Sequence, residues 1–439
     1  MKMLTFKGGT HPPEKKELSN KVSIAEMLVP EIVYVFLSNH AGAPAKCVVK
    51  ENDFVKTGQV IGEPGGFISA YVHSPVTGVV KKIDKIYHPI QGRPMDVVVI
   101  ERTSNDEWQL LDHEQDWQSM TKEQLIDVVK KAGIVGLGGA MFPTHVKLNP
   151  PPDKKIDVFI VNGAECEPYL TVDHRLLLER TQDLIIGIQI VMKILGAEKA
   201  YIGVESNKLD AYKHLKSFLD SADKIEVKLL KTKYPQGAEK QLIYAITGRK
   251  VPVGGLPMDV GVVVQNVQTV IAIKEAVVDR KPLVRRALTI SGEGVKNPVN
   301  VYARIGTTVE QLLNFAGGLK EDAERVILGG PMTGIAINRL DIPIMKGTSG
   351  ITVLLKEKPS VQKNCIRCSK CVQACPMGLQ PYLLYYLSTK KKYDAAYSEG
   401  LFSCIECGVC AYVCPSKVEH VRAIKLAKKV YQAIRGGKK

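Results

Sequence analysis

The chain of 439 residues has no hydrophobic run long enough to cross a bilayer, which takes about 20 consecutive apolar residues. Its longest apolar stretch, Leu184–Leu195, is shorter than that and carries Lys193, so it is predicted to be a buried helix. The basic N-terminal residues are not followed by the apolar segment of a secretory signal peptide. We therefore expect a chain without a transmembrane segment, peripheral to any membrane on which it acts.

Cysteine is nearly absent outside two short stretches. Of the ten cysteines, only Cys47 and Cys166 lie elsewhere, and we expect both to be small buried side chains. A secreted disulfide scaffold would be shorter and richer in cysteine, so that class is excluded. Thiolates that hold a metal must stay reduced, which predicts exposure to the cytoplasm.

Acidic side chains are too few to balance the basic ones, and the formal net charge is +15. Such a surface is either simply solvated or attracts an acidic protein or an anionic membrane face. No basic stripe alternates with aromatic side chains, which make up 6% of the chain, so nucleic acid is not an expected partner.

Two copies of one cysteine pattern are the strongest signal in the sequence. "NCIRCSKCVQACP" (Asn364–Pro376) and "SCIECGVCAYVCP" (Ser403–Pro415) both contain C-x2-C-x2-C-x3-C-P. In two-cluster ferredoxins the close triplet holds one cubane and the fourth cysteine holds the other. We predict two [4Fe–4S] clusters, one held by Cys365, Cys368, Cys371 and Cys414, the other by Cys404, Cys407, Cys410 and Cys375. Two structural zinc sites fit less well, because a zinc site usually pairs two distant C-x2-C halves.

The rest of the chain reads as several domains, multidomain α/β plus β in class. Residues 1–29 are predicted to form an extended arm. Residues 30–105 alternate short β-runs with glycine turns and resemble a lipoyl-like barrel-sandwich hybrid domain. The hairpin tip that would carry a lysine in a carrier domain reads "EPGGFISAYVHSP", without lysine. A structural or docking module is therefore expected there, not a swinging arm.

Residues 120–280 alternate strands and helices, which predicts a parallel α/β sheet. Residues 285–357 return to β-runs and resemble a soluble-ligand-binding β-grasp (SLBB-like) module. Residues 360–439 contain both cysteine motifs and are predicted to form a helical, ferredoxin-like domain with two [4Fe–4S] clusters.

Glycine and polar side chains form four groups within the α/β segment. These are Gly136, Gly138, Gly139, Phe142 and Lys147; Asn162, Glu165 and Glu167; Tyr234, Gly237 and Glu239; and Gln265, Asn266 and Thr269. We expect all four at strand-to-helix junctions, and therefore at one rim of the sheet, where such folds bind cofactors. The alternative is that each group only caps its own helix.

The residue types in these groups suit a nucleotide. Glycines let the backbone approach a ligand closely and present N–H groups to phosphate. Lys147 reaches the same anion, and Phe142 offers a flat face for stacking. Asn162 suits the edge of a heterocycle, while Glu165 and Glu167 suit a ribose hydroxyl or a nicotinamide amide.

The same positions resemble the NADH-oxidising flavoprotein subunit of respiratory complex I. The resemblance rests on Gly136-x-Gly138-Gly139-Ala140-x-Phe142-Pro143-Thr144-x-x-Lys147, Asn162-x-x-Glu165-x-Glu167-Pro168, Tyr234-x-x-Gly237-x-Glu239 and Asn266-Val267-x-Thr269. It implies contacts to FMN from Gly136, Gly138, Gly139, Lys147, Asn162 and Asn266, and contacts to NADH from Phe142, Glu167 and Glu239. Glu165, Tyr234 and Thr269 complete the implied binding set. The chain departs from the family at Ala164 and Ala238, where an acid is usual, and at Gln265, where asparagine is usual.

Over essentially its full length the chain resembles the RnfC family of the bacterial Rnf complex. The segments that carry this resemblance are "FKGGTHPP", "GGAMFPTHVKL", "VNGAECEP", "GGPMTG" and both cysteine motifs. The resemblance implies a peripheral, NADH-oxidising subunit on the cytoplasmic face of a membrane complex that couples electron exchange between NADH and ferredoxin to Na+ or H+ movement. The implied partners are the complex's membrane and ferredoxin-like subunits, with ferredoxin itself reached indirectly.

The hypothesis is an electron path from NADH to FMN, to one cluster, to the other and then to partner subunits. One alternative is a cobalamin-reductase-like subunit, which shares the flavin and ferredoxin parts. Another is a wiring or assembly subunit with a vestigial flavin site, an idea prompted by Ala164, Ala238 and Gln265.

Overall fold

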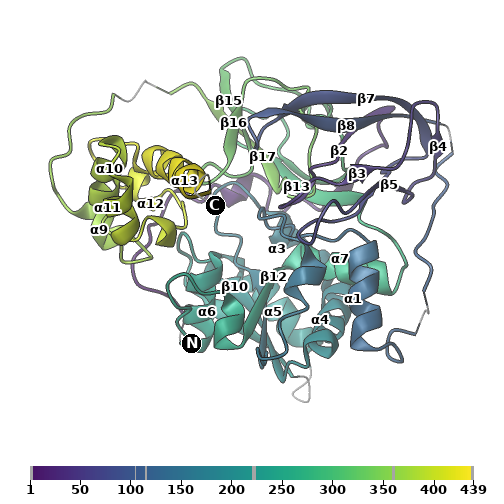
Figure 1. The fold of residues 1–439 in the computed structure, drawn as a ribbon, viewed down its shortest axis with the longest axis horizontal. Coiled ribbons are helices and arrows are strands. Elements are labelled where there is room, and N and C mark those ends of the chain that lie inside the picture. The colour runs from purple at the N-terminus through teal and green to yellow at the C-terminus, as the bar shows by residue number, and fades with distance from the viewer. Residues whose placement is uncertain (1–2, 104, 114–115, 220–223, 358–360, 437–439) are drawn as a thin grey trace.

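The computed structural model describes residues 3–103, 105–113, 116–219, 224–357 and 361–436 (Figure 1). An α/β domain, two β-rich domains and a helical domain pack against one another, and the N-terminal segment runs between them. The predicted class, multidomain α/β plus β, is confirmed. None of the described helices combines the length and apolar character needed to cross a membrane.

The α/β domain is built on four parallel strands in the order β11-β10-β9-β12. Their bounds are β9 Val158–Gly163, β10 Lys199–Glu205, β11 Ile225–Leu230 and β12 Val262–Asn266. The strands are short apolar runs because helices cover both faces of the sheet. The helices are α1 Lys122–Lys131, α2 Thr144–Lys147, α3 Val172–Glu179, α4 Thr181–Leu195, α5 Leu209–Phe218, α6 Glu239–Thr247 and α7 Val267–Val277.

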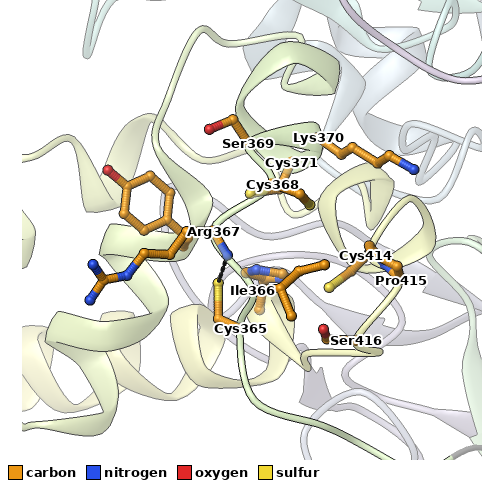
Figure 2. Close-up of a pocket in the computed structure, with 12 residues that line it drawn as sticks. Cys365, Ile366, Arg367, Cys368, Ser369, Lys370, Cys371, Cys414, Pro415 and Ser416 are labelled. Carbon is orange, nitrogen blue, oxygen red and sulfur yellow. Dashed lines mark hydrogen bonds between the residues drawn. The ribbon is translucent and has the colours of Figure 1, made fainter.

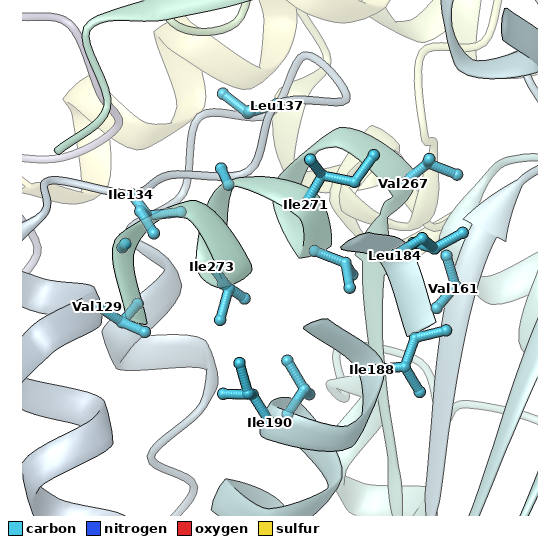
Figure 3. Close-up of a cluster of buried hydrophobic side chains, with 14 of the residues drawn as sticks. Val129, Ile134, Leu137, Val161, Leu184, Ile188, Ile190, Val267, Ile271 and Ile273 are labelled. Carbon is cyan, nitrogen blue, oxygen red and sulfur yellow. The ribbon is translucent and has the colours of Figure 1, made fainter. Parts of the chain in front are cut away.

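One face of this sheet holds the largest core of the molecule. Val129 of α1, Ile190 of α4 and Ile273 of α7 point toward one another in Figure 3, and all are buried. On the opposite face α6 packs Leu242 and Ile243 against the strands. The apolar stretch Leu184–Leu195 is therefore a buried helix, as predicted, and it ends at Gly196 in the left-handed conformation that favours glycine.

The barrel-sandwich domain has two small antiparallel sheets, ordered β2-β8-β7-β4 and β3-β5-β6. The bounds are β2 Ile32–Phe36, β3 Lys46–Cys47, β4 Phe54–Val55, β5 Val60–Glu63, β6 Val72–His73, β7 Gly78–His88 and β8 Arg93–Arg102. Its lysine-free hairpin lies so close to the loop that follows α1 that a side chain at Gly133 would collide with the Tyr71 carbonyl. The Ala41 N–H also donates 2.9 Å to the Met141 carbonyl. The domain therefore packs directly against the rim of the α/β domain.

The β-grasp domain has a six-stranded sheet in the order β1-β14-β13-β17-β15-β16. The bounds are β1 Ala25–Glu26, β13 Arg285–Ser291, β14 Val299–Arg304, β15 Ala323–Leu328, β16 Ile335–Ile337 and β17 Gly350–Leu355, with α8 at Val309–Phe315. Its edge strand β1 comes from the N-terminal segment, which also forms bridges at Leu4 and Thr10 with residues of the α/β domain. The N-terminal segment is thus tied to its neighbours along its length.

The helical domain contains both cysteine motifs. Its helices are α9 Lys370–Ala374, α10 Pro381–Thr389, α11 Tyr393–Ser398, α12 Val409–Tyr412 and α13 His420–Gly436. The small core lies where α10 packs on α13, with Leu384, Leu387 and Ile424 buried between them. The stretch between the motifs is helical as predicted, divided into α10 and α11.

Candidate functional site: a flavin-type rim and two cysteine sets

The glycine-rich loop folds into a tight turn on the rim of the sheet. The Gly136 N–H donates 2.9 Å to the Phe142 carbonyl, and the Met141 N–H donates 3.0 Å to the Gly136 carbonyl. A side chain at Gly138 would come within 3.2 Å of Asn266, whereas Gly139, at φ +105°, has open space beside it. The loop therefore needs glycine for a close approach and for its backbone conformation.

The prediction that all four polar groups follow strands is wrong for this loop. Three groups do lie at or just after the carboxyl ends of β9, β11 and β12, but the glycine-rich loop lies between α1 and α2. A tertiary contact brings it to the rim: the Leu137 N–H donates 2.9 Å to the hydroxyl of Thr269. The rim is thus assembled from three strand ends and one loop that a distant threonine anchors.

Asn162 joins two of the strand ends. Its side-chain N–H group donates 2.8 Å to the Gly237 carbonyl, and its oxygen accepts 3.2 Å from the Ala164 N–H. The Gly237 N–H in turn donates 3.3 Å to the Cys166 sulfur. These bonds hold the segment after β9 against the segment after β11.

The Glu165 carboxylate is occupied by the start of α3. It accepts hydrogen bonds of 2.7 Å from the Asp173 N–H and 3.2 Å from the His174 N–H. This is an N-terminal cap supplied by a residue outside the helix. Glu165 was predicted to contact the cofactor, but its carboxylate caps a helix instead, which is the alternative that the sequence left open.

Sequence reasoning missed Asp173. Its carboxylate accepts 2.7 Å from the Asn266 side chain, whose oxygen also caps α7 by accepting 2.9 Å from the Gln268 N–H. Burial, helped by the negative charge of Glu165, raises the pKa of Asp173 to about 7. An acid in the first turn of a helix is so common that the pattern alone gives no signal for this contact.

Glu167 is held by the β-grasp domain. Its carboxylate accepts 3.0 Å from the Met332 N–H and a further bond from the Thr333 hydroxyl. A side chain at Gly330 would collide with that carboxylate, so the "GGPMTG" turn must pass close by. Burial raises the pKa of Glu167 above its usual range.

Lys147 and Glu239 form an ion pair at the rim. The Lys147 ammonium lies 2.5 Å from the Glu239 carboxylate, and both side chains are partly exposed. Glu239 begins α6, and Phe142 is half-buried in the loop that precedes Lys147. The two charged groups, predicted from separate motifs, therefore meet.

Lys16 is a second residue that the sequence did not reveal. Its buried ammonium donates to the carbonyls of Glu165 (2.6 Å), Glu167 (2.8 Å) and Leu170 (2.5 Å). The N-terminal segment thus fixes the backbone of the loop after β9 from a distance of about 150 residues along the chain. Nothing in the pattern around Lys16 distinguishes it from an ordinary surface lysine.

Tyr234 reaches from the rim to the helical domain. Its side chain is buried, and its hydroxyl donates 2.8 Å to the backbone carbonyl of Cys407. Gln241 makes a second contact, donating 3.2 Å to the Pro376 carbonyl. The cysteine loops around Cys375 and Cys407 therefore face the α/β domain.

Two cavities separate the eight cysteines into sets of four. The outer cavity, of about 120 Å³, is lined by Cys365, Cys368, Cys371 and Cys414 (Figure 2). One water needs roughly 10–15 Å³ on the same scale, so this cavity admits a much larger group. Cys414 comes from the second motif, so the structure brings the fourth cysteine to the triplet of the other motif.

The inner cavity is narrower, about 20 Å³, and its lining includes Cys375, Cys404, Cys407 and Cys410. Among the described residues that line it, none carries a formally charged side chain. Four thiols in each cavity are the donor set of a [4Fe–4S] cluster, so the residues present fit that group.

The two triplets have matching backbones. Arg367 and Glu406 occupy the same place in the two motifs and share the left-handed conformation, with φ 56° and 58°. Each donates its N–H to the sulfur of the preceding cysteine, Cys365 or Cys404, at 3.4 Å. Hydrogen bonds to cluster sulfurs are among the factors that tune a cluster's potential.

Four family models match consecutive parts of the chain. They are the RnfC barrel sandwich hybrid domain over residues 4–105, the Nuo51 FMN-binding domain over 129–275, the SLBB domain over 288–336 and a 4Fe-4S dicluster domain over 358–426. The fold predicted from sequence is confirmed, and so are its cofactors, FMN and two [4Fe–4S] clusters.

Curated relatives match almost the whole chain. The C-subunit of the proton-translocating ferredoxin:NAD(+) oxidoreductase complex of Clostridium ljungdahlii is 46% identical over 90% of this chain and 87% of its own length. The corresponding protein of the Na(+)-translocating complex of Acetobacterium woodii is 45% identical over 97% of this chain and 96% of its own.

A solved structure shares the fold. The NAD+-reducing [NiFe]-hydrogenase in its H2-reduced state matches with a TM-score of 0.50 and 18% identity, over 72% of this chain and 62% of the other. The high-identity relatives and the barrel-sandwich match together assign the chain to one family. The members of that family are subunits of an oxidoreductase complex. The chain belongs to the RnfC family of ion-translocating ferredoxin:NAD(+) oxidoreductase complexes, the Rnf complexes.

Proposed function

We propose that this chain oxidises NADH at the rim of its α/β domain and delivers the electrons through its cysteine domain to other subunits of an Rnf-type complex. The observation that carries the proposal is the contact between Tyr234 and Cys407, which joins the rim to the inner cysteine set. Membership of the RnfC family favours this role over that of a cobalamin reductase.

At the rim, the backbone of Gly136, Gly138 and Gly139 would cradle the phosphate of FMN. Lys147, Asn162 and Asn266 would complete the FMN contacts. FMN accepts a hydride's two electrons and passes them on singly, which links a nicotinamide to one-electron clusters. The protein's part is to hold donor and acceptors in line.

Phe142, Glu167 and Glu239 would contact NADH. Phe142 supplies a face for stacking, and Glu239 supplies a carboxylate that Lys147 keeps in place. Glu167 is buried and already accepts two hydrogen bonds from the "GGPMTG" turn, which would hold its carboxylate in place for that contact. Tyr234, Thr269 and Glu165 would position the surrounding loops.

The two cysteine sets would serve in a fixed order. The inner set lies against the α/β domain, and a side chain at Gly408 would come within 2.9 Å of the Met332 carbonyl in the β-grasp turn. In the outer set Cys365 and Cys368 are exposed. The inner cluster would therefore receive electrons from the rim, and the outer cluster would release them.

The partners would be the membrane-bound and ferredoxin-like subunits of the complex, with ferredoxin reached through them. The chain would sit peripherally on the cytoplasmic face of the bacterial membrane. The basic excess of +15 suits a place beside acidic lipid or protein.

The test is anaerobic purification, reconstitution with iron, sulfide and FMN, and addition of NADH while the visible spectrum is recorded. Bleaching of the flavin band followed by loss of cluster absorbance is expected. Clusters that dithionite reduces but NADH does not, in a chain that retains no FMN, would instead support the wiring subunit suggested by Ala164, Ala238 and Gln265.

A further inference from the structure

The rim of the outer cavity is basic. Arg367 and Lys370 line the cavity together with the cysteines, and no aspartate or glutamate is among the described residues that do so (Figure 2). Residues 361–370 are all exposed. Within the part of the chain that the structure describes, neither Arg367 nor Lys370 forms an ion pair.

The charge of the surrounding sequence is equally one-sided. Between residues 361 and 392 there are six basic residues and no acidic one. The six are Lys363, Arg367, Lys370, Lys390, Lys391 and Lys392. A cluster of one sign beside an exposed electron carrier raises the on-rate of a partner with the opposite charge.

The second motif shows what a charged side chain at the position of Arg367 does when an oppositely charged partner lies beside it. Glu406 is the matching residue, with the same left-handed backbone and the same N–H···S bond. Its carboxylate pairs at 2.8 Å with Lys428 of α13, and this contact helps to fix the helix beside the inner set. In the first motif the charge is reversed, and Arg367 is exposed to solvent.

Apolar surface accompanies these charges. Ile366 is 67% exposed and Tyr382 37% exposed, and both line the outer cavity. An exposed isoleucine and tyrosine flanked by exposed cations form the apolar centre and charged rim that protein interfaces use. A site that served only to bind an anionic membrane would not require the exposed cysteines Cys365 and Cys368 beside it.

We propose that Ile366, Arg367, Lys370 and Tyr382 form the docking face for an acidic electron-carrying protein, which receives electrons from the outer cysteine set. The inference rests on the proposed function, because it takes the outer set as the point of electron release. Arg367 would pair with a carboxylate of the partner as Glu406 pairs with Lys428 within the chain.

The test uses the full chain, reconstituted with FMN, iron and sulfide, and reduced with two equivalents of dithionite, which supply the four electrons that FMN and the two clusters take up. It is mixed in a stopped-flow instrument with an oxidised, acidic two-[4Fe–4S] bacterial ferredoxin as the probe. Arg367→Glu is the main variant, since Glu406 shows that glutamate is accommodated in this turn. Lys370→Glu is the second variant, and Lys429→Glu, an exposed residue on α13, is the matched control.

At low ionic strength, Arg367→Glu and Lys370→Glu are each expected to slow the second-order electron transfer to ferredoxin about tenfold. Added salt should slow transfer from the parent, because it screens the attraction, and should accelerate transfer from the variants or leave it unchanged. Lys429→Glu should behave like the parent. Transfer rates within twofold of the parent for both rim variants would overturn the proposal. So would a loss of binding to phosphatidylglycerol vesicles without any change in transfer to ferredoxin.

Reduction of the chain's own clusters by NADH is measured separately in each variant. Because dithionite supplies the electrons in the transfer experiment, a chain that NADH cannot reduce still reports on docking. Failure of the proposed function and failure of the docking face therefore give different results.

Discussion

The Tyr234 hydroxyl donates a hydrogen bond of 2.8 Å to the backbone carbonyl of Cys407. Tyr234 also exchanges backbone hydrogen bonds of 2.8 and 2.9 Å with Thr10. One residue therefore joins the N-terminal segment, the rim of the α/β domain and the inner cysteine set. This contact ties the inner cysteine set to the rim.

Tyr234→Phe tests that contact. Loss of the hydroxyl leaves the Cys407 carbonyl without its partner, which costs about 1–3 kcal/mol of stability. Flavin reduction by NADH should keep its rate, whereas the later reduction of the clusters should slow. Rapid-mixing absorbance separates the two phases, and Tyr244→Phe, on a partly exposed tyrosine, is the control. Equal slowing of both phases would contradict a role at the junction.

Glu239→Gln removes the charge that Lys147 pairs with. We expect KM for NADH to rise about tenfold with a smaller change in kcat, the pattern of a lost binding contact. Steady-state assays with an artificial acceptor measure both constants. Glu226→Gln is the control, because Glu226 pairs with Lys228 at the surface away from the rim. An unchanged KM would remove Glu239 from the NADH site.

Lys16→Met keeps most of the side-chain volume but removes three hydrogen bonds to the loop after β9. Bonds from charged donors contribute about 1.5–3 kcal/mol each, so a loss of at least about 2 kcal/mol is expected. The FMN content should fall with it. Lys15→Met is the control, since Lys15 is partly exposed and its ammonium pairs with Glu293 at 3.2 Å near the surface. Thermal unfolding and flavin fluorescence report the two effects.

Each motif contributes its fourth cysteine to the triplet of the other motif, and this exchange predicts how much iron different double variants lose. If Cys365 and Cys414 hold one cluster, their double serine variant should lose no more iron than either single variant, about half of the total. The pair Cys404 and Cys414 should lose nearly all of it. Iron analysis and the EPR spectrum of the reduced protein measure this. The reverse result would show that each motif holds its own cluster.

His73 makes stability depend on pH. Burial, together with the nearby Lys346 ammonium, lowers the pKa of His73 to about 3. Its folded pKa lies below the unfolded value near 6.5, so the neutral ring's contribution is present above about pH 6.5 and is lost as the pH falls toward 3. Between pH 7 and 5, the parent should lose about 2 kcal/mol more than His73→Gln.

Urea unfolding followed by tryptophan fluorescence measures this difference. Trp108 reports on the barrel-sandwich domain that contains His73, because its backbone forms a bridge with Thr57 of that domain. His11→Gln, on an exposed histidine, is the control and should follow the parent. If the free energy of unfolding falls equally with pH in the parent and in His73→Gln, the ring takes up its proton over the same pH range in the folded and unfolded states. That result would contradict the prediction.

Local patterns predicted much of this molecule. The short apolar runs became β9, β10 and β12 because a strand covered on both faces by helices must be apolar throughout. The spacing of each cysteine triplet gives the two loops the same local backbone, as the matched left-handed conformations of Arg367 and Glu406 show. Glycine also marked the close approach at Gly138, where a side chain would come within 3.2 Å of Asn266 and force it to shift.

Contacts between distant segments followed from no local pattern. The carboxylate of Glu165 was expected to face the cofactor, but the start of α3 occupies it. The glycine-rich loop reaches the rim through Thr269, 132 residues away from Leu137. A sequence motif records which residue types are present, whereas the partner that each polar group satisfies depends on which segments fold beside it.

The sequence by itself determined the cofactor class and the order of the domains, because cysteine spacing, glycine turns and apolar periodicity act within a few residues. Only the tertiary structure decided which cysteine set faces the flavin domain and which faces solvent. It also decided that Lys16 is buried under the site while Arg367 is exposed to solvent. Those outcomes depend on packing between domains, where burial and hydrogen bonding select one arrangement from many that the local patterns permit.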